Sequence, residues 1–426
     1  MTAKIHIERM MHRNSIQVLG DSAATYALLK LIPSGGGVKP MGLNLALVVD
    51  VSGSMYEEDG TGVSRLKRVQ DAAVSAIEKL NPDDSIAIIA FAHNALTLLP
   101  ATKVAEKDKI EDVIRRIDLF DVDPGGTSMD DGMRLGLEEV QRLSNGKGLS
   151  QVVVLTDGET SGETTCRELA QEAARKKIHL TMMGVGVDWK ASLIKDLAKL
   201  SEGKWYYIDV NQKEEAERIF VQEFEQLAAT AFTDVELHLK PMKDIKVKRV
   251  RQVVPEIKTL NLNEPEERHM VAALGTLQHD HATRYVLELT VPKRPDGKFV
   301  IAQLEVTYDL GTGKRESTGT VPLEMTYTAA GQGYVNAEVM KHIDEVQIAE
   351  MNEVLQKAIA QNNEAEVQKV AEQIVKKGEL MGPRAAKKTM LAKQVREEIN
   401  ASGRVSKKTQ LALEDSARMA EEMPTG

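Results

Sequence analysis

A carboxylate and two hydroxyls stand at alternate positions behind an apolar run near residue 50. Residues 43–49 read Leu-Asn-Leu-Ala-Leu-Val-Val, and Asp50, Ser52 and Ser54 follow. Short apolar runs of this kind predict a strand that is buried on both faces of a parallel sheet. Ligands bind such sheets at the carboxyl ends of the strands, where these three side chains would lie. Their oxygens are hard ligands, which suit Mg²⁺ rather than Zn²⁺.

Two later segments each add another oxygen ligand. Residues 123–129 read Asp-Pro-Gly-Gly-Thr-Ser-Met, a glycine-rich turn that presents Thr127. Residues 152–158 read Val-Val-Val-Leu-Thr-Asp-Gly, a second apolar run that leads to Asp157. Both segments are predicted at the same edge of the sheet as the first one. The sequence therefore predicts that the oxygen ligands of all three segments form one metal site.

The five predicted ligands resemble the metal-ion-dependent adhesion site (MIDAS) of the von Willebrand factor A (vWA) domain family. They are Asp50, Ser52, Ser54, Thr127 and Asp157. The first three match the first motif of that site, Thr127 matches the second and Asp157 the third, without substitution. The resemblance implies a protein with an intact MIDAS that binds Mg²⁺ or Mn²⁺. An alternative for the first motif is a polar turn in which the two serines cap the next helix.

Ligand chemistry suggests a role for each of the five side chains. The hydroxyls of Ser52 and Ser54 would bind the cation directly, and that of Thr127 directly or through water. Asp50 and Asp157 would bind through water or hold the coordinating groups in place. The cation would then keep much of its positive charge and favour an anionic sixth ligand. In the family that this site resembles, the sixth ligand is typically a Glu or Asp of a partner protein.

The segments between residues 40 and 229 alternate between strand-like and helix-like patterns. Strands are predicted at Leu43–Asp50, Ser85–Phe91, Ala95–Leu99, Gln151–Asp157, Ile178–Val185 and Lys204–Asp209. Helices are predicted over residues 63–80, 106–117, 130–143, 163–175, 190–200 and 212–229. This alternation predicts a doubly wound, Rossmann-like α/β sheet with helices on both faces.

The flanks of this region show the period-two alternation of strands. Three short N-terminal strands could not hold a core alone. We therefore expect one β-sandwich, built from residues 1–39 and 230–328, with the vWA domain inserted as residues 40–229. Bacterial proteins with this type of domain and the inter-alpha-trypsin inhibitor heavy chains are similar in having β segments on both sides.

The last segment, residues 329–426, shows the helical period and predicts a C-terminal helical domain. Breaks at Gln361-Asn-Asn, Gly382-Pro383 and Asn400-Ala-Ser-Gly divide it into about four helices. One interpretation is a helical bundle packed on the sandwich. The other is an arm that binds a partner or a second copy of the chain.

Composition excludes several classes of protein. The chain has 426 residues, a net charge of −9 and 4% aromatic residues, so a basic surface or a stacking platform for nucleic acid is not expected. The single cysteine, Cys166, favours a reducing compartment. The sequence shows neither a signal peptide nor an apolar run of about 18 residues, so we expect no membrane span and a cytoplasmic location.

These observations predict a cytoplasmic scaffold or adaptor that binds an acidic residue of a partner protein through the metal, and not an enzyme. Family resemblance implies AAA-type ATPases or kinase and phosphatase signalling proteins as partners. One alternative is Mg²⁺-dependent phosphoryl transfer as in haloacid-dehalogenase phosphatases, although Ser52 stands where they need a second Asp. Another is a structural vWA protein with an unused site.

His279 and His281 are the closest pair of histidines in the sequence, and they lack an evident third ligand for zinc.

Overall fold

The computed structural model describes residues 4–34, 40–58, 60–119, 123, 125–143, 148–157, 160–186, 190–201, 203–209 and 214–418. The chain divides into two compact units. The first unit consists of Met1–Val38, Asp234–Asp309 and Arg315–Gly426. The second unit consists of Lys39–Thr233 and Leu310–Lys314. None of the helices in the described ranges is long and apolar enough to cross a membrane.

The second unit contains a six-stranded sheet with the order β5-β4-β3-β6-β7-β8. Strand β3 (Leu43–Asp50) lies near its centre and pairs in parallel with β4 and β6. The other parallel strands are β4 (Ser85–Phe91), β6 (Leu149–Thr156), β7 (Ile178–Val185) and β8 (Lys204–Ile208). Only the edge strand β5 (Ala95–Lys103) is antiparallel to its neighbour. Because β3, β4 and β6 run in the same direction, their carboxyl ends meet at one edge of the sheet.

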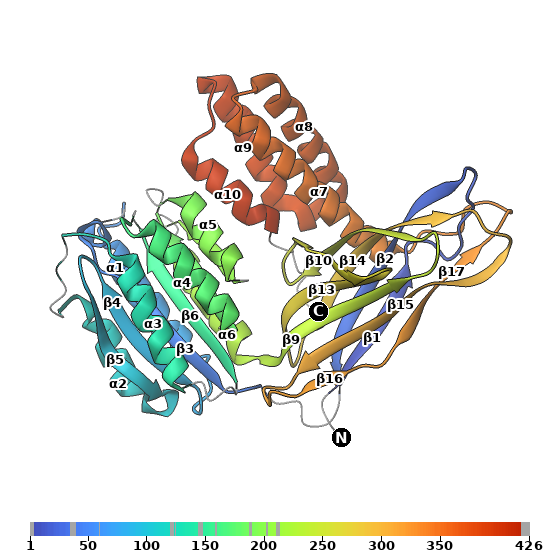
Figure 1. Ribbon diagram of the computed structural model, residues 1–426. Helices are drawn as coiled ribbons and strands as arrows, with labels where there is room; N and C mark the ends of the chain where they lie inside the picture. Colours follow the sequence, from blue (N-terminus) through green and yellow to red (C-terminus); the bar gives the residue numbers. More distant parts are fainter. Residues whose placement is uncertain are drawn as a thin grey trace. The chain divides into compact units, whose positions relative to one another are not determined.

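Helices cover both faces of this sheet (Figure 1). Their bounds are α1 (Arg65–Ile77), α2 (Lys107–Arg115), α3 (Met129–Leu143), α4 (Glu163–Arg175), α5 (Ala191–Leu200) and α6 (Glu215–Ala228). Alternate residues of β3, such as Leu45 and Leu47, pack in one core with α1, α2 and α6. Helix α3 contacts β3, β4 and β6 on the opposite face of the sheet. Helices α4 and α5 contact the neighbouring strand β7. The predicted doubly wound α/β fold is confirmed by this arrangement.

Two glycines let α3 approach the sheet closely. A Cβ atom on Gly132 would lie 2.8 Å from Phe91 Cδ1, and one on Gly136 would lie 2.8 Å from Val48 Cγ2. Both distances are too short for carbon atoms, so larger residues here would push α3 away from the sheet. Since α3 begins two residues after Thr127, these glycines also determine how near that residue lies to the strand ends.

The first unit contains two further sheets. The first sheet has the order β1-β2-β14-β10-β11, and the second has the order β12-β13-β9-β15-β16 with β17 paired to β15. Strands of the first sheet are β1 (Lys4–Met11), β2 (Ser22–Ser34), β14 (Thr283–Pro292), β10 (Lys246–Val254) and β11 (Lys258–Leu260). Those of the second are β12 (Asn263–Glu266), β13 (His269–Gln278), β9 (Thr230–Pro241), β15 (Gly297–Asp309), β16 (Arg315–Ser317) and β17 (Val321–Tyr327).

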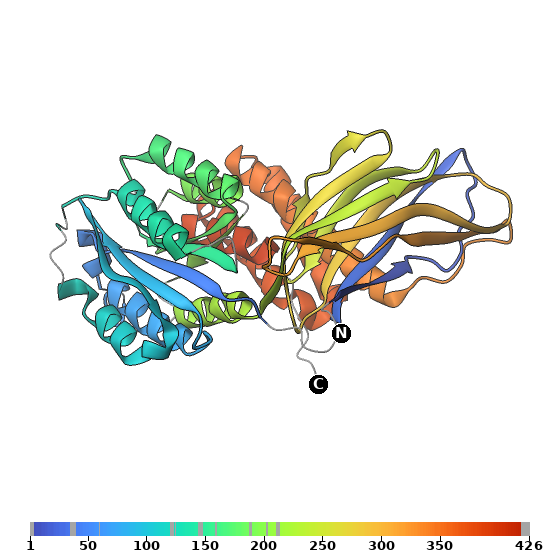
Figure 2. The same cartoon turned by 60° about the horizontal axis from the view of Figure 1, so that its bottom comes forward.

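Strands from both ends of the sequence meet in the first sheet. Strand β2 pairs with β14 from Thr283 opposite Leu31 to Pro292 opposite Ser22. In Figure 2 the N-terminal strands, drawn in blue, accordingly run among strands drawn in yellow and brown. The two β-rich flanks of the sequence therefore share a sheet. The boundary that we expected at residue 39 lies outside the described residues.

The C-terminal residues form helices α7 (Ala337–Ala360), α8 (Glu364–Met381), α9 (Ala386–Ser402) and α10 (Lys407–Arg418). Side chains of α7 to α10 share one apolar core. The first half of α7 packs on the first sheet, where Val339, Ile343 and Val346 join Leu28 and Val286. The structure therefore shows a helical bundle that packs on a sheet of its own unit.

Candidate metal site

Asp50, the last residue of β3, is fully buried at the carboxyl edge of the six-stranded sheet. Its Oδ1 accepts a hydrogen bond from Ser52 N at 2.9 Å, and its Oδ2 accepts one from Thr156 Oγ1 at 2.7 Å. No Lys, Arg or His of the described residues forms an ion pair with it. Burial, reinforced by the charge of the nearby Asp157, raises the pKa of Asp50 to about 6 despite these hydrogen bonds. The site thus contains a buried carboxylate without a counter-charge.

The two serines of the first motif lie side by side. Ser52 Oγ and Ser54 Oγ are 3.2 Å apart, and Ser54 Oγ donates to Asp157 Oδ1 at 2.8 Å. Ser52 precedes the short 3₁₀ helix η1 (Gly53–Tyr56) but makes no side-chain capping bond to it. Helix α1 is capped by Ser64 instead, whose Oγ accepts from Lys67 N. The hydrogen bonds therefore do not support the capping alternative for the first motif.

Arg65 is a charged partner of the site that the sequence analysis missed. Its Nη1 lies 2.7 Å from Asp157 Oδ2, and its Nη2 lies 3.1 Å from Glu57 Oε2. The Asp157 side chain is 0% exposed and that of Arg65 is 12% exposed, whereas Glu57 is 64% exposed. Arg65 and Asp157 are 92 positions apart, so no local pattern could have indicated this pair.

Thr127 is held near the end of β4 by its neighbours. Ser128 N donates to Ala92 O at 2.6 Å, and Ser128 Oγ donates to His93 O at 2.9 Å. On its other side, Thr160 Oγ1 donates to Thr127 O at 2.8 Å. Thr127 is half-buried. No hydrogen bond within the described residues joins its hydroxyl to the other four predicted ligands, so its side chain lies outside their hydrogen-bonded network.

One continuous chain of hydrogen bonds connects the groups of the site. It runs through Thr156, Asp50, Ser52, Ser54 and Asp157 to Arg65. The carboxylates of Asp50 and Asp157 accept hydrogen bonds from Ser52 N and Ser54 Oγ, respectively, and these bonds orient the two serines. Thr156 and Arg65 complete the chain, but neither belongs to the motif that we recognised in the sequence.

The donor set fits a hard divalent cation. Ligands at adjacent corners of an octahedron with Mg–O distances of about 2.1 Å lie about 3 Å apart, close to the 3.2 Å between the two serine Oγ atoms. The negative charge of the two buried carboxylates exceeds the positive charge of Arg65, so the site favours a cation. In the parts of the chain that the structure describes, no group of three or more His, Cys, Asp or Glu is placed to hold a metal. A softer, nitrogen- or sulfur-rich site is therefore not formed by these residues.

Other candidate groups do not form a site. Cys166 is buried on α4, and burial raises the pKa of its thiol to about 12, so it is not an activated nucleophile. His279 Nδ1 and His281 Nδ1 lie 3.8 Å and 2.8 Å from Asp280 Oδ1. These three residues sit on one turn and do not converge on a metal position.

Comparison with known proteins identifies the family of the domain that contains this site. The family model of the von Willebrand factor type A domain matches residues 44–222. The uncharacterised protein sll0103 of Synechocystis is 30% identical over 302 residues, which are 70% of this chain and 69% of that protein. The uncharacterised protein YfbK of Escherichia coli is 23% identical over 202 residues, which are 46% of this chain and 33% of YfbK.

Two solved structures are similar to the whole chain. A von Willebrand factor type A protein from Catenulispora acidiphila has a TM-score of 0.75 at 15% identity, over 98% of this chain and 97% of that one. The ArnB paralog VWA2 from Sulfolobus acidocaldarius has a TM-score of 0.54 at 14% identity, over 97% and 98%. At these identities the similarity shows the fold alone.

Proposed function

Since this chain belongs to the von Willebrand factor type A domain family, we propose that it is an adaptor that binds a partner protein through a divalent cation. Domains of this family are often metal-dependent protein interaction modules. The observation that carries the proposal is the hydrogen-bonded chain of Asp50, Ser52, Ser54 and Asp157 at the carboxyl edge of the sheet.

Ser52 and Ser54 would hold the cation, which we propose to be Mg²⁺ or Mn²⁺, and Thr127 would complete the MIDAS from the neighbouring loop. Asp50 and Asp157 orient these hydroxyls and supply the negative charge that offsets the cation. When bound, the cation supplies positive charge for an anionic ligand. Because the residues that touch it are neutral, it attracts a Glu or Asp side chain of the partner.

Binding explains the site better than catalysis does. Both oxygens of Asp50 accept hydrogen bonds, which leaves this carboxylate poorly placed to attack a phosphate. Ser52 stands where a haloacid-dehalogenase phosphatase needs its acid–base carboxylate. We therefore propose that the protein is not an enzyme. AAA-type ATPases and kinase or phosphatase signalling proteins are the partner classes to test first, in the cytoplasm.

Metal binding is tested by calorimetry with Mg²⁺ and Mn²⁺ on the full chain. We expect one site in the wild type and loss of binding in the double variant Ser52→Ala, Ser54→Ala. Ser75→Ala, which removes a serine hydroxyl elsewhere on α1, should bind like the wild type. Equal binding by the wild type and the double variant would overturn the metal site.

Partner binding is tested by capture from native lysate with Mg²⁺ or with EDTA. Proteins retained only with Mg²⁺, and lost with Asp50→Ala or Thr127→Ala while each bait still shows a cooperative thermal unfolding transition, would support the adhesion mechanism. If Asp50→Ala in EDTA retains the same proteins, recognition does not use the metal.

A further inference from the structure

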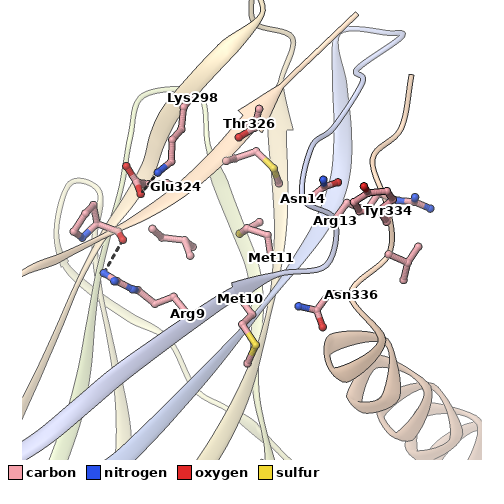
Figure 3. Close-up of a pocket in the computed structure, with 14 residues that line it drawn as sticks. Arg9, Met10, Met11, Arg13, Asn14, Lys298, Glu324, Thr326, Tyr334 and Asn336 are labelled. Carbon is pink, nitrogen blue, oxygen red and sulfur yellow. Dashed lines mark hydrogen bonds and ion pairs between the residues drawn. The ribbon is translucent and has the colours of Figure 1, made fainter. Parts of the chain in front are cut away.

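The first unit contains a cleft of about 480 Å³ between the edges of its two sheets. One wall is the end of β1, the opposite wall is β17, and the segment before α7 closes one end (Figure 3). The volume lies within the range of about 300–1,000 Å³ that is usual for ligand sites. This cleft belongs to a different unit from the metal site.

Part of β17 is an open sheet edge. The strand pairs with β15 on one side. On the other side, the described residues show one backbone bridge, at Ile16, and β1 lies close by without forming strand pairs to β17. There, Ile16 N donates to Thr326 O at 2.9 Å, and Thr328 N donates to Ile16 O at 3.0 Å. In an antiparallel strand the N–H and C=O of one residue point to the same side, and the side alternates along the strand. The backbone of Thr326 therefore points away from β15, and so does that of Glu324.

A second contact supports this alternation. Arg9 Nη1 reaches across the cleft and donates to Pro322 O at 2.9 Å, so Pro322 also points away from β15. Proline has no N–H to offer an added strand and is typical of exposed edges. Between the contacts at Pro322 and Thr326, the N–H and C=O of Glu324 face the cleft without a strand partner among the described residues. These are the groups to which another strand can bind.

The cleft carries excess positive charge. Arg9 and Arg13 donate to backbone carbonyls, and neither has a carboxylate within ion-pair distance in the described parts of the chain. Glu324, the carboxylate in the lining, already lies 2.7 Å from Lys298 Nζ (Figure 3). Two guanidinium groups are therefore left for an incoming anion, and guanidinium binds carboxylates through paired hydrogen bonds.

Apolar surface lies beside these charges. Tyr334 is 80% exposed and Val335 is 42% exposed, and the half-buried Met10 and Met11 line the β1 wall. Successive side chains of an extended peptide point to opposite sides. A peptide along β17 can therefore direct one set of side chains to the arginines and the other set to this apolar surface.

We propose that this cleft binds an extended acidic segment of a partner protein, which adds as a strand to the free edge of β17. The backbone of Glu324 pairs with the segment, and Arg9 and Arg13 bind its carboxylates. This mode of recognition obtains affinity from main-chain hydrogen bonds and specificity from alternate side chains. The proposal does not depend on the metal, since none of these residues belongs to the metal site.

The test is selection from a phage library of random peptides on the immobilised full chain, in EDTA so that the metal site does not contribute. We expect enrichment of proline-poor peptides in which Asp or Glu alternates with apolar residues. Enriched peptides are then synthesised, and their Kd is measured by fluorescence polarisation. Enrichment of basic peptides, or of no peptide, would overturn the proposal.

Two pairs of variants examine the two parts of the mechanism. Arg9→Gln with Arg13→Gln should weaken binding by about tenfold or more. The control, Arg268→Gln with Lys293→Gln, removes the same charge from exposed positions between strands and should leave binding unchanged. Glu324→Pro removes the outward N–H and should abolish strand addition, while Glu324→Gln keeps it and should retain binding. Thermal unfolding checks that each variant is folded. Binding that survives both Arg9→Gln with Arg13→Gln and Glu324→Pro would overturn the proposal.

Discussion

At the scale of single residues, the proposed metal site combines one paired and one unpaired carboxylate. Asp157 is fully buried and bound by Arg65, whereas Asp50 is fully buried without a cation. The two residues should therefore respond differently to substitution. Both tryptophans, Trp189 and Trp205, lie between residues 39 and 233, so tryptophan fluorescence follows the unfolding of the unit that contains the site.

Replacing Arg65 by Gln should destabilise this unit in EDTA. The change leaves the buried Asp157 carboxylate without its cation, and such uncompensated charges cost about 3–5 kcal/mol. We expect a lower midpoint of thermal unfolding by tryptophan fluorescence and a larger recovery with Mg²⁺ than the wild type shows. Lys67→Gln, which breaks an exposed ion pair on the same helix, should change stability by about 0.5 kcal/mol or less. An unchanged midpoint for Arg65→Gln would contradict the role of this pair.

The raised pKa of Asp50 predicts a pH-dependent effect of Asp50→Asn. The folded pKa is about 6 against 3.8 ordinarily, so between these values the folded state holds a proton that the unfolded state releases. The contribution of Asp50 to stability is therefore present below 3.8 and is lost as the pH rises to about 6. In EDTA, the stability of Asp50→Asn relative to wild type should rise by about 3 kcal/mol over this window.

Urea unfolding followed by tryptophan fluorescence at several pH values measures this difference. Mg²⁺ should reduce it above pH 6, because a nearby cation stabilises the carboxylate. A difference between Asp50→Asn and wild type that does not vary with pH would show that Asp50 titrates normally.

At the scale of elements, β2 is the connection between the N-terminus and the rest of the first unit. It lies between β1 and β14, and its residues Leu28, Leu29 and Leu31 are fully buried. Every residue of β14, from Thr283 to Pro292, pairs with a residue of β2. Loss of β2 would expose a complete strand edge together with core side chains.

A chain that lacks residues 1–32 should therefore aggregate. Its β14 would present unpaired N–H and C=O groups beside uncovered apolar surface, a combination that promotes association through strand edges. Size-exclusion chromatography of the soluble fraction measures the outcome, with a chain that lacks only residues 1–3 as control. A soluble, cooperatively unfolding protein of residues 40–426 would show that the second flank folds without the first.

At the scale of the whole molecule, the two proposed binding sites lie in different units. The proposed metal site lies in the second unit, and the cleft beside β17 lies in the first. Two units with separate sites suit an adaptor that holds two protein segments at once. The effect of each ligand on stability should then be confined to its own unit.

Mg²⁺ should slow hydrogen exchange in one unit only. A ligand at 100 times its Kd stabilises the native state by about 2.7 kcal/mol, and this applies to the unit that binds it. Exchange measured by mass spectrometry should slow in peptides from β3 and β6 and stay unchanged in peptides from α7 to α10. The double variant Ser52→Ala, Ser54→Ala should show no change in either. Equal slowing in the helical bundle would mean that the units unfold together.

Local patterns were sufficient for most elements of the second unit. The predicted bounds of β3, β4 and β7 agree with the structure, because continuous apolar runs specify buried strands regardless of their neighbours. Helix α1 begins at Arg65 rather than at residue 63, because Ser64 caps it. In the C-terminal part, the Gln361-Asn-Asn break falls between α7 and α8, where Asn363 caps the second helix.

The sequence by itself thus determined the class of the fold and predicted the residues of the proposed metal site, because the fold class depends on short-range periodicity and the site prediction on a motif of closely spaced oxygen ligands. Tertiary structure alone decided which groups surround those ligands, as the pair of Arg65 with Asp157 shows. It also decided that β2 lies against β14 and that, among the described residues, part of the β17 edge has no strand partner. Contacts between distant residues are selected by packing and register over the whole chain, and no local pattern encodes that selection.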